Sequence, residues 1–171
     1  MSLLNFISQL FTKKSKKQNS LPTVKSSVHK YLTKEDILKE LSVVKQKYKD
    51  VSFSDEHMVR SILVGYNLKI SADSLRERNE LLSKSEVGDI VNWFSDRCHY
   101  IESLHRADEL DITEGIWISS GCCGPRGKPV NHDKFNGKKF LLKDGLMYRG
   151  KAYFPGCEQY CRCGHKSVLP F

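Results

Sequence analysis

The chain has 171 residues, of which 39% are hydrophobic and 28% are charged, and its formal net charge is +8. This composition is typical of a globular protein and excludes a wholly disordered chain. No apolar run approaches the roughly 20 residues that a membrane-spanning helix needs, and we expect no transmembrane segment and no signal peptide. The sequence therefore predicts a protein kept in a cytosol, where thiols stay reduced.

The charge is distributed unevenly and divides the chain into three parts. Residues 1–30 hold six Lys and no acid, residues 31–118 hold 12 basic and 17 acidic residues, and residues 119–171 hold 10 basic and 3 acidic residues. Basic ends suit contact with DNA or another polyanion, although a solvated basic surface explains the same pattern. We divide the chain into a basic amphipathic segment with a linker (1–30), a helical region (31–110) and a Cys/His-rich module (111–171).

The first residues have the pattern of an amphipathic helix followed by a cluster of lysines. The apolar positions with helical spacing are Leu3, Leu4, Ile7, Leu10 and Phe11. Residues 1–17 could lie on an anionic membrane or dock on a partner. An isolated helix this short is marginal in water, so the segment could equally pack on its own domain or not fold. Residues 18–30 are typical of a flexible linker.

Two helices are predicted next. The first covers residues 33–48, where Thr33 and Asp36 have the spacing of a capping box. The second begins near Ser54 or Asp55, positions that suit a helix N-cap. The side chains predicted to point inward from these two helices are Ile37, Leu41, Val44, Tyr48, Met58, Ile62, Leu63 and Tyr66.

Two further helices follow, at residues 71–83 and 85–105. The first of them is more polar, and we expect it to contribute Leu75, Leu81 and Leu82 to the core. The second has a long apolar face at helical spacing, formed by Val87, Ile90, Val91, Phe94, Cys98, Ile101 and Leu104. Such a face is far more often core than a cofactor site, and we interpret Cys98 as a small buried hydrophobe.

The pattern changes from helix to strand at Asp111. A short strand is predicted at residues 116–118, and a loop rich in Gly and Pro follows it. Asp144-Gly145 predicts a hairpin between apolar residues 140–142 and 146–148, and Arg149-Gly150-Lys151 predicts a second turn. The sequence thus predicts an α+β fold, in which a small N-terminal helical bundle precedes a small β-rich module. A module of this size usually needs a metal, disulfides or a neighbour for stability.

Cysteine and histidine are concentrated in the predicted module. In a reduced compartment such a cluster suggests a structural zinc ion, because thiolate and imidazole are the ligands that zinc prefers. A set of four could draw on the first loop, on His132 and on the segment near the end of the module. The candidate ligands are Cys122, Cys123, His132, Cys157, Cys161 and Cys163.

Other interpretations of these cysteines stay open at this point. Neither Cys-Cys nor Cys-x-Cys is the usual spacing of a zinc-finger knuckle, so the thiols could simply be packed. They could form a disulfide if the protein reaches the outside of a cell. Cys122-Cys123 with His132 as a base also allows a nucleophile, but no third group that would orient the base is evident.

The module resembles the C-terminal domain of phage Mu F-like minor head proteins. That pattern has a Trp-containing strand, a loop that often bears Cys, a His shortly before an Asn/Asp-Gly-Lys-x-Phe segment, a hairpin, Pro-Gly and a final Cys-Arg-Cys. The matching residues here are Ile116-Trp117-Ile118, Gly121-Cys122-Cys123, His132, Asn136-Gly137-Lys138-Lys139-Phe140, Lys143-Asp144-Gly145-Leu146, Arg149-Gly150-Lys151, Pro155-Gly156-Cys157-Glu158 and Cys161-Arg162-Cys163.

The resemblance implies a role in phage or prophage head morphogenesis as a minor capsid protein. It covers about 50 residues, and the helices before it fit the family only in being helical. Proteins of this family associate with the portal and with DNA packaging. The implied partners are therefore the portal or other head proteins and DNA, and the implied locations are the host cytoplasm and the virion.

Individual residues of the module carry further predictions. Asn136 and Gly137 suit a tight turn in which the side chains of His132 and Asn136 satisfy backbone groups. Arg162 could contact phosphate, but we favour a structural ion pair with Asp133 or Glu158. The candidates for contact with nucleic acid or a partner are Lys128, Lys138, Lys139 and Arg162.

Two alternative functions remain beside a non-enzymatic structural role, which we favour. His132-Asp133 followed by Asn136 has some similarity to metal-dependent nucleases, so a nuclease or toxin-like effector using His132 is one alternative. The module supplies only Asp133, Asp144 and Glu158 as acidic ligands. A zinc-stapled adaptor, held at a membrane by residues 1–17, is the other.

Overall fold

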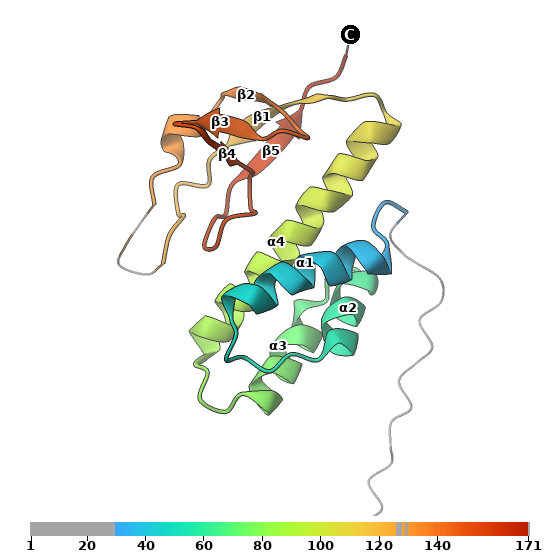
Figure 1. The fold of residues 1–171 in the computed structure, drawn as a ribbon, viewed down its shortest axis with the longest axis vertical. Helices are drawn as coiled ribbons and strands as arrows, with labels where there is room; N and C mark the ends of the chain where they lie inside the picture. The colour runs from blue at the N-terminus through green and yellow to red at the C-terminus, as the bar shows by residue number, and fades with distance from the viewer. Residues whose placement is uncertain (1–29, 126–127, 129, 171) are drawn as a thin grey trace, which may run out of the picture.

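A computed structural model describes residues 30–125, 128 and 130–170 of the chain (Figure 1). Four helices precede two small antiparallel sheets, which confirms the α+β fold. The helices are α1 (Lys34–Lys47), α2 (Asp55–Leu63), α3 (Leu68–Arg78) and α4 (Lys84–Glu109). The predicted amphipathic helix, the linker and the contact surface at residues 1–17 lie outside the described residues. Among the helices that are described, none has an apolar stretch of the length that a bilayer requires.

The helix starts follow from their caps. The Thr33 hydroxyl accepts from the backbone N–H of Asp36, whose carboxylate accepts in return from the Thr33 N–H at 3.0 Å. Ser83 and Glu86 form the same reciprocal arrangement at the start of α4. Each pair satisfies N–H groups that a helix start leaves without partners, and the predicted capping box at Thr33 is confirmed.

The boundaries predicted for the third helix are wrong. Helix α3 ends before Asn79, because the Asn79 side chain bonds backbone groups of Leu75 and Ser52 and thereby joins the helix end to the loop before α2. Leu81, which was expected in the core, is fully exposed in the turn that follows. The side-chain amide of Asn79 satisfies backbone groups that further helical turns would otherwise satisfy, and a short, polar helix gains little by continuing.

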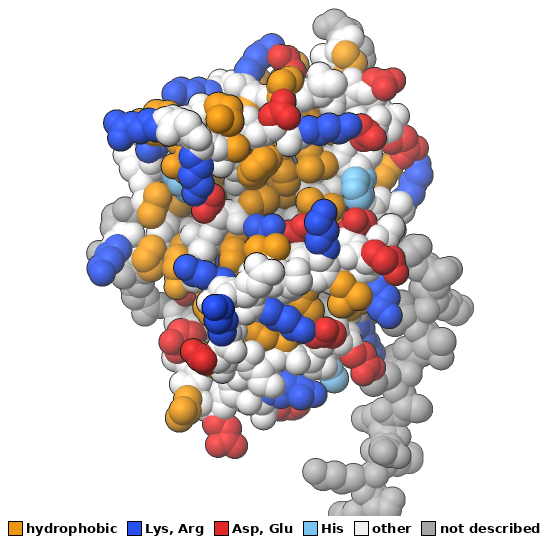
Figure 2. Space-filling view, in the orientation of Figure 1, with side chains coloured by type: hydrophobic (Ala, Val, Ile, Leu, Met, Phe, Trp, Pro, Cys, Tyr) orange, Lys and Arg blue, Asp and Glu red, His pale blue; other side chains and the backbone are white. Residues whose placement is uncertain are grey.

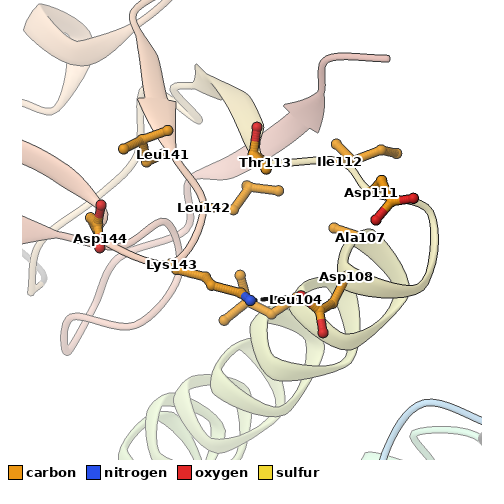
Figure 3. A pocket seen from close by; sticks show the side chains of 10 residues that line it. All are labelled: Leu104, Ala107, Asp108, Asp111, Ile112, Thr113, Leu141, Leu142, Lys143 and Asp144. Carbon is orange, nitrogen blue, oxygen red and sulfur yellow. Dashed lines mark hydrogen bonds and ion pairs between the residues drawn. The ribbon is translucent and has the colours of Figure 1, made fainter. Parts of the chain in front are cut away.

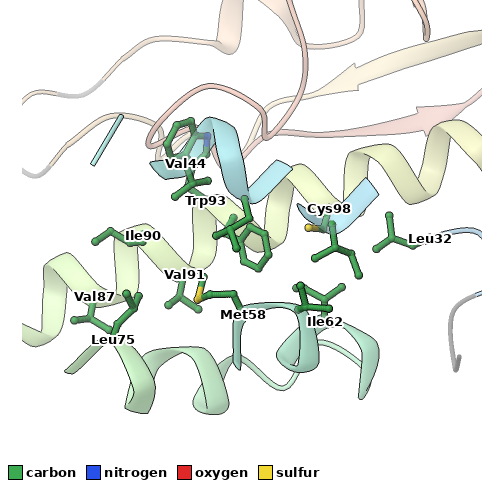
Figure 4. Packing of buried hydrophobic residues seen from close by; sticks show 14 residues of the cluster. Leu32, Val44, Met58, Ile62, Leu75, Val87, Ile90, Val91, Trp93 and Cys98 are labelled. Carbon is green, nitrogen blue, oxygen red and sulfur yellow. The ribbon is translucent and has the colours of Figure 1, made fainter. Parts of the chain in front are cut away.

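The helices enclose one hydrophobic core, in which the expected face of α4 is central (Figure 4). Phe94 and Cys98 of α4 are completely buried, which confirms the interpretation of Cys98. The core residues come from all four helices and from Leu32. They are Leu32, Ile37, Leu41, Val44, Met58, Val59, Ile62, Leu75, Val87, Ile90, Val91, Trp93, Phe94 and Cys98.

Strand β1 (Glu114–Ile118) is the centre of a three-stranded antiparallel sheet. It pairs on one side with β2 (Lys139–Leu141) and on the other with β5 (Gly164–Ser167). A separate hairpin consists of β3 (Leu146–Tyr148) and β4 (Lys151–Tyr153), as the turn at Arg149-Gly150 predicts.

The prediction that Asp144-Gly145 connects two paired strands is wrong. Strand β2 pairs with β1, and a single bridge from Leu141 to Gly145 connects it to the turn. Phe140 and Leu142 point into the core beside Trp117, and this burial selects β1 as the partner of β2.

Gly145 is the glycine whose replacement we expect to cost most. Its φ is +76°, and an added Cβ would lie 2.7 Å from the carbonyl oxygen of Tyr153. Because that oxygen belongs to the backbone, Gly145→Ala should lower the free energy of unfolding by about 2 kcal/mol or more. Gly88→Ala in α4 is the control, since a Cβ there meets no atom within 4 Å. It should stabilise the protein by about 0.5–1 kcal/mol in the same urea titration.

The module lies along one side of α4 and makes direct hydrogen bonds to it. The Trp93 indole N–H and the Arg97 guanidinium both donate to the carbonyl of Cys157, each at 2.9 Å. The Tyr100 hydroxyl donates to the carbonyl of Leu142 at 2.6 Å. Helix α4 therefore serves both halves of the fold. Apolar side chains gather between the two halves on the face shown in Figure 2.

A pocket of about 340 Å³ lies where the end of α4 meets the loop after β2 (Figure 3). Leu104, Ala107 and Leu142 form its apolar part. An ion pair between Asp108 and Lys143 crosses its rim at 2.6 Å. Both side chains of this pair are more than half exposed, so the pair contributes little to stability.

Candidate metal centre

Four residues with ligand side chains converge inside the module. Cys123 lies in the loop after β1, His132 precedes a short 3-10 helix (Asp133–Phe135), and Cys161 and Cys163 precede β5. All four residues are at most 7% exposed, and their ligand atoms lie within 4.8 Å of one another. This group joins three segments of the module at one point. It can bind a metal ion.

The distances between the ligand atoms suit a tetrahedral ion. The Sγ of Cys123 is 3.4 Å from that of Cys163 and 3.9 Å from that of Cys161. The Nδ1 of His132 is 3.5 Å from the Cys161 sulfur and 3.7 Å from the Cys163 sulfur. Tetrahedral zinc, with Zn–S near 2.3 Å and Zn–N near 2.0–2.1 Å, separates its ligand atoms by about 3.5–3.8 Å. All six cysteines are free, so no disulfide closes the module.

Hydrogen-bond donors surround the sulfur atoms. The backbone N–H of Arg162 donates to the Cys123 sulfur at 3.2 Å. The Trp117 indole nitrogen is buried and makes no hydrogen bond of ordinary geometry to the described residues. It is nevertheless close enough to the Cys163 sulfur to lower the pKa of that thiol. A negatively charged sulfur would give this orphaned N–H the acceptor that it lacks.

The electrostatics of the cysteine pair favour one thiolate. The pKa of Cys163 is lowered, first by a hydrogen bond from the Cys161 thiol and further by donors from Ser120, Cys123 and Trp117. The pKa of Cys161 is raised, first by this hydrogen bond and then by burial. A buried thiolate needs a compensating positive charge, and a metal ion would supply it.

His132 is oriented by aromatic neighbours. Its ring is stacked on Phe135 with centroids 5.6 Å apart and meets the edge of Trp117 at 6.0 Å. This packing leaves Nδ1 directed at the two sulfurs of the Cys161-Arg162-Cys163 segment. A fixed ring loses little conformational entropy on binding a metal, which favours occupancy of the site.

The other two predicted ligands lie outside this group. Cys122 is exposed, whereas its neighbour Cys123 is buried. Cys157 faces α4, where burial raises the pKa of its thiol to about 12. His165 lies in β5 between the rings of Tyr100 and Phe140, and burial lowers its pKa.

Arg162 makes the structural ion pair that was favoured, but with different partners. It pairs with Asp89 at 3.5 Å and Asp96 at 3.4 Å, both on α4. Asp133 accepts from the Ser119 hydroxyl, and Glu158 pairs with Lys151. Burial raises the pKa of Asp96 to about 6, although the charge of Arg162 acts against this shift.

The predicted turn at Asn136 and Gly137 is present, but only the Asn136 side chain satisfies a backbone group, because the His132 ring faces the sulfurs of Cys161 and Cys163. The Asn136 side chain accepts from the backbone N–H of Ser119 at 3.0 Å, and Gly137 has a φ of +76°. The Gly137 N–H donates to the carbonyl of Trp117 at 2.8 Å. The turn therefore fixes the chain between His132 and β2 against β1. The predicted contact residues Lys128, Lys138 and Lys139 are exposed, and Lys139 pairs with Glu114 at 3.2 Å.

The described residues contain one group suited to a metal, and it has three thiols and one imidazole but no carboxylate. Asp133 and Asn131 instead line a pocket of about 220 Å³ beside Cys123 and His132. Hydrolytic metal sites keep an open coordination position, whereas four protein ligands complete a tetrahedron. The arrangement thus has the chemistry of a structural centre.

The fold and the site define the class of this protein. It is an α+β protein with a buried group of three cysteines and one histidine that can bind a metal ion. Comparisons with family models, with curated proteins and with solved structures find no match to this chain.

Proposed function

We propose that the chain is a non-enzymatic structural protein whose module folds around a zinc ion held by Cys123, His132, Cys161 and Cys163. The observation that carries this proposal is that four of the six distances between the ligand atoms, 3.4–3.9 Å, lie close to the edges of a zinc tetrahedron. Three thiolates and an imidazole are a ligand set that selects zinc over the harder cations magnesium and calcium. The module has a small core, and a metal is one of the means by which modules of this size gain stability.

The role that we propose for this protein is in the assembly of a phage or prophage head. The residues that carry the resemblance to Mu F-like minor head proteins are also residues of the candidate centre. Cys161-Arg162-Cys163 contributes two ligands and a tie to α4, and His132 contributes a third ligand. Trp117 packs beside them. The shared pattern therefore coincides with a folding unit, which supports the assignment of the module. The portal, other head proteins and DNA are its proposed partners, and the host cytoplasm and the virion are its proposed locations.

Elemental analysis tests the zinc centre. Protein purified under reducing conditions should contain one zinc per chain, and Cys161→Ser should contain less than a quarter of that amount. Cys157→Ser is the matched control and should retain its zinc, since that thiol faces α4. Less than one zinc per four chains in the unaltered protein would exclude the centre.

The assembly role has a separate test. The gene of a head protein should lie beside genes for a portal and a terminase, and the protein should sediment with particles after induction. If the protein stays in the soluble fraction while particles form, the head role is wrong but the zinc centre is unaffected.

A further inference from the structure

A second cluster, centred on Tyr148 of the β3–β4 hairpin, consists of basic side chains around an aromatic ring. Lys134, Lys138 and Arg149 lie with their charged groups 4.5, 5.9 and 5.3 Å from the centroid of the Tyr148 ring. Lys151 lies 4.9 Å from the centroid of the Tyr153 ring. We call these six residues the Tyr148 patch. In Figure 2, Lys and Arg side chains are concentrated at the upper left, over this part of the module.

The three cations around Tyr148 have no acidic partner among the described residues. Lys134, Lys138 and Arg149 are all exposed and make no ion pair there, whereas Lys151 pairs with Glu158. Like charges gathered around one ring repel one another, and the attraction of each for the ring offsets only part of this repulsion. A bound polyanion would remove it.

Arg149 occupies a turn position whose backbone conformation favours a different residue type. It is the first central residue of the two-residue turn between β3 and β4, and its φ is +50°. Such a turn prefers Asn before the Gly, since Asn tolerates the left-handed region better than Arg does. The guanidinium is thus held beside Tyr148 at a cost in backbone strain, which is typical of residues retained for binding.

The patch is connected to the candidate metal centre by aromatic contacts. Phe135 is stacked on His132, and its ring lies 5.3 Å from Tyr148 and 5.1 Å from Tyr153. Lys134 is the residue before Phe135 and belongs to the same 3-10 helix. A metal that fixes His132 therefore also fixes the two tyrosines that the cations surround.

We propose that the Tyr148 patch binds the sugar-phosphate backbone of nucleic acid, without regard to sequence. Nucleic acid carries about one charge per 3.4 Å along each strand, a density that suits several cations gathered at one place. The half-buried tyrosines between the cations offer apolar contact to sugars and bases, and poly-glutamate has no rings that could use it. The inference rests on the proposed metal centre, because that centre positions Phe135 beneath the patch.

The test measures affinity for a fluorescent 30-nucleotide single strand and its duplex by anisotropy, at 50 and 200 mM salt. The full chain should bind, and binding should weaken with salt. The variant Lys134→Gln/Arg149→Asn should bind about tenfold more weakly, with a salt dependence reduced by about two released counterions. Arg149→Asn also places Asn-Gly in the turn, so its midpoint of thermal unfolding should rise. Weaker binding could then not be attributed to misfolding.

Lys84→Gln/Arg76→Gln is the matched control. It removes the same charge from exposed positions on the helical part, and its affinity should change less than twofold. Equal losses in the two double variants, no binding at 50 mM salt, or tighter binding to poly-glutamate than to DNA would each overturn the proposal. Zinc content, measured on every sample, separates the two proposals. A zinc-loaded protein that does not bind DNA contradicts only the patch, and a protein without zinc contradicts the centre.

Discussion

Cys163→Ser should unfold the module and leave the helical core folded. Structural zinc contributes on the order of 10 kcal/mol to the folding of small peptides, more than the roughly 3–5 kcal/mol that a core of this size supplies. The chain has two tryptophans: Trp117 is buried in the module, whereas Trp93 lies in the helical core and also donates to the carbonyl of Cys157 in the module. Trp117 is therefore the reporter of the module. In the variant, Trp117 should become exposed to solvent, whereas the helical circular dichroism should largely remain.

A variant that keeps only Trp117 assigns the change in fluorescence to the module. Trp93→Phe leaves Trp117 as the only indole and also removes the hydrogen bond from Trp93 to Cys157. Relative to Trp93→Phe alone, the Trp117 emission should shift to longer wavelength both when Cys163→Ser is added and after a strong zinc chelator is added. Cys122→Ser is the matched control, since Cys122 is exposed and belongs to the same loop as a ligand. If the Trp117 emission of Cys163→Ser stays that of a buried indole, the metal does not hold the module together.

Glu40→Ala should destabilise the junction between the two halves by about 3–5 kcal/mol. Glu40 of α1 is 5% exposed, and its carboxylate accepts from two nitrogens of Arg97 at 2.6 and 2.7 Å. The Arg97 side chain is also largely buried and donates to the carbonyl of Cys157 in the module. Removal of the carboxylate leaves a buried guanidinium without its counter-ion, and this cost exceeds that of losing the Glu40 contacts themselves.

Urea-induced unfolding measures this effect, and the exposed pair of Lys143 and Asp108 provides the comparison. Asp108→Ala should change the free energy of unfolding by less than about 1 kcal/mol, because water screens that pair. The double variant Glu40→Leu/Arg97→Met should recover most of the stability that Glu40→Ala loses, since it removes both charges and keeps the volume. A loss of less than 1 kcal/mol in Glu40→Ala would show that water reaches Arg97.

Local patterns in the sequence predict most of the helical part. The apolar face of α4 and the cap at Thr33 depend on residues a few positions apart, so they can be read without knowing the fold. The end of α3 could not be predicted, because Asn79 bonds a residue 27 positions away. The same holds for the buried pair of Glu40 and Arg97, which lies on two different helices.

The module was predictable in kind but not in its pairings. Strand β5 was missed because Gly-His-Lys-Ser has neither the alternation nor the β-branched residues of a strand, and only its pairing with β1 makes it one. The sequence offered six candidate ligands, and the structure brings four of them together. The direction in which each cysteine points decides which ones meet, and for Cys157 this direction follows from the contact with α4. The Tyr148 patch was not foreseen beyond Lys138, although Lys and Arg close to aromatic residues were a visible signal.

The central position of β1 has a consequence for the order of folding. Its partners follow it at long range, since Gly115 faces Phe140 on one side and Ser167 on the other. Each helix closes its own hydrogen bonds within a few residues, and helical cores form faster than sheets that close long loops. The helices should therefore form first and expose the side of α4 on which the module packs. The sheet should form later, because bringing its distant strands together costs conformational entropy. An ion that gathers Cys123, His132 and Cys161 would shorten that search, and refolding of the module should accelerate with zinc concentration.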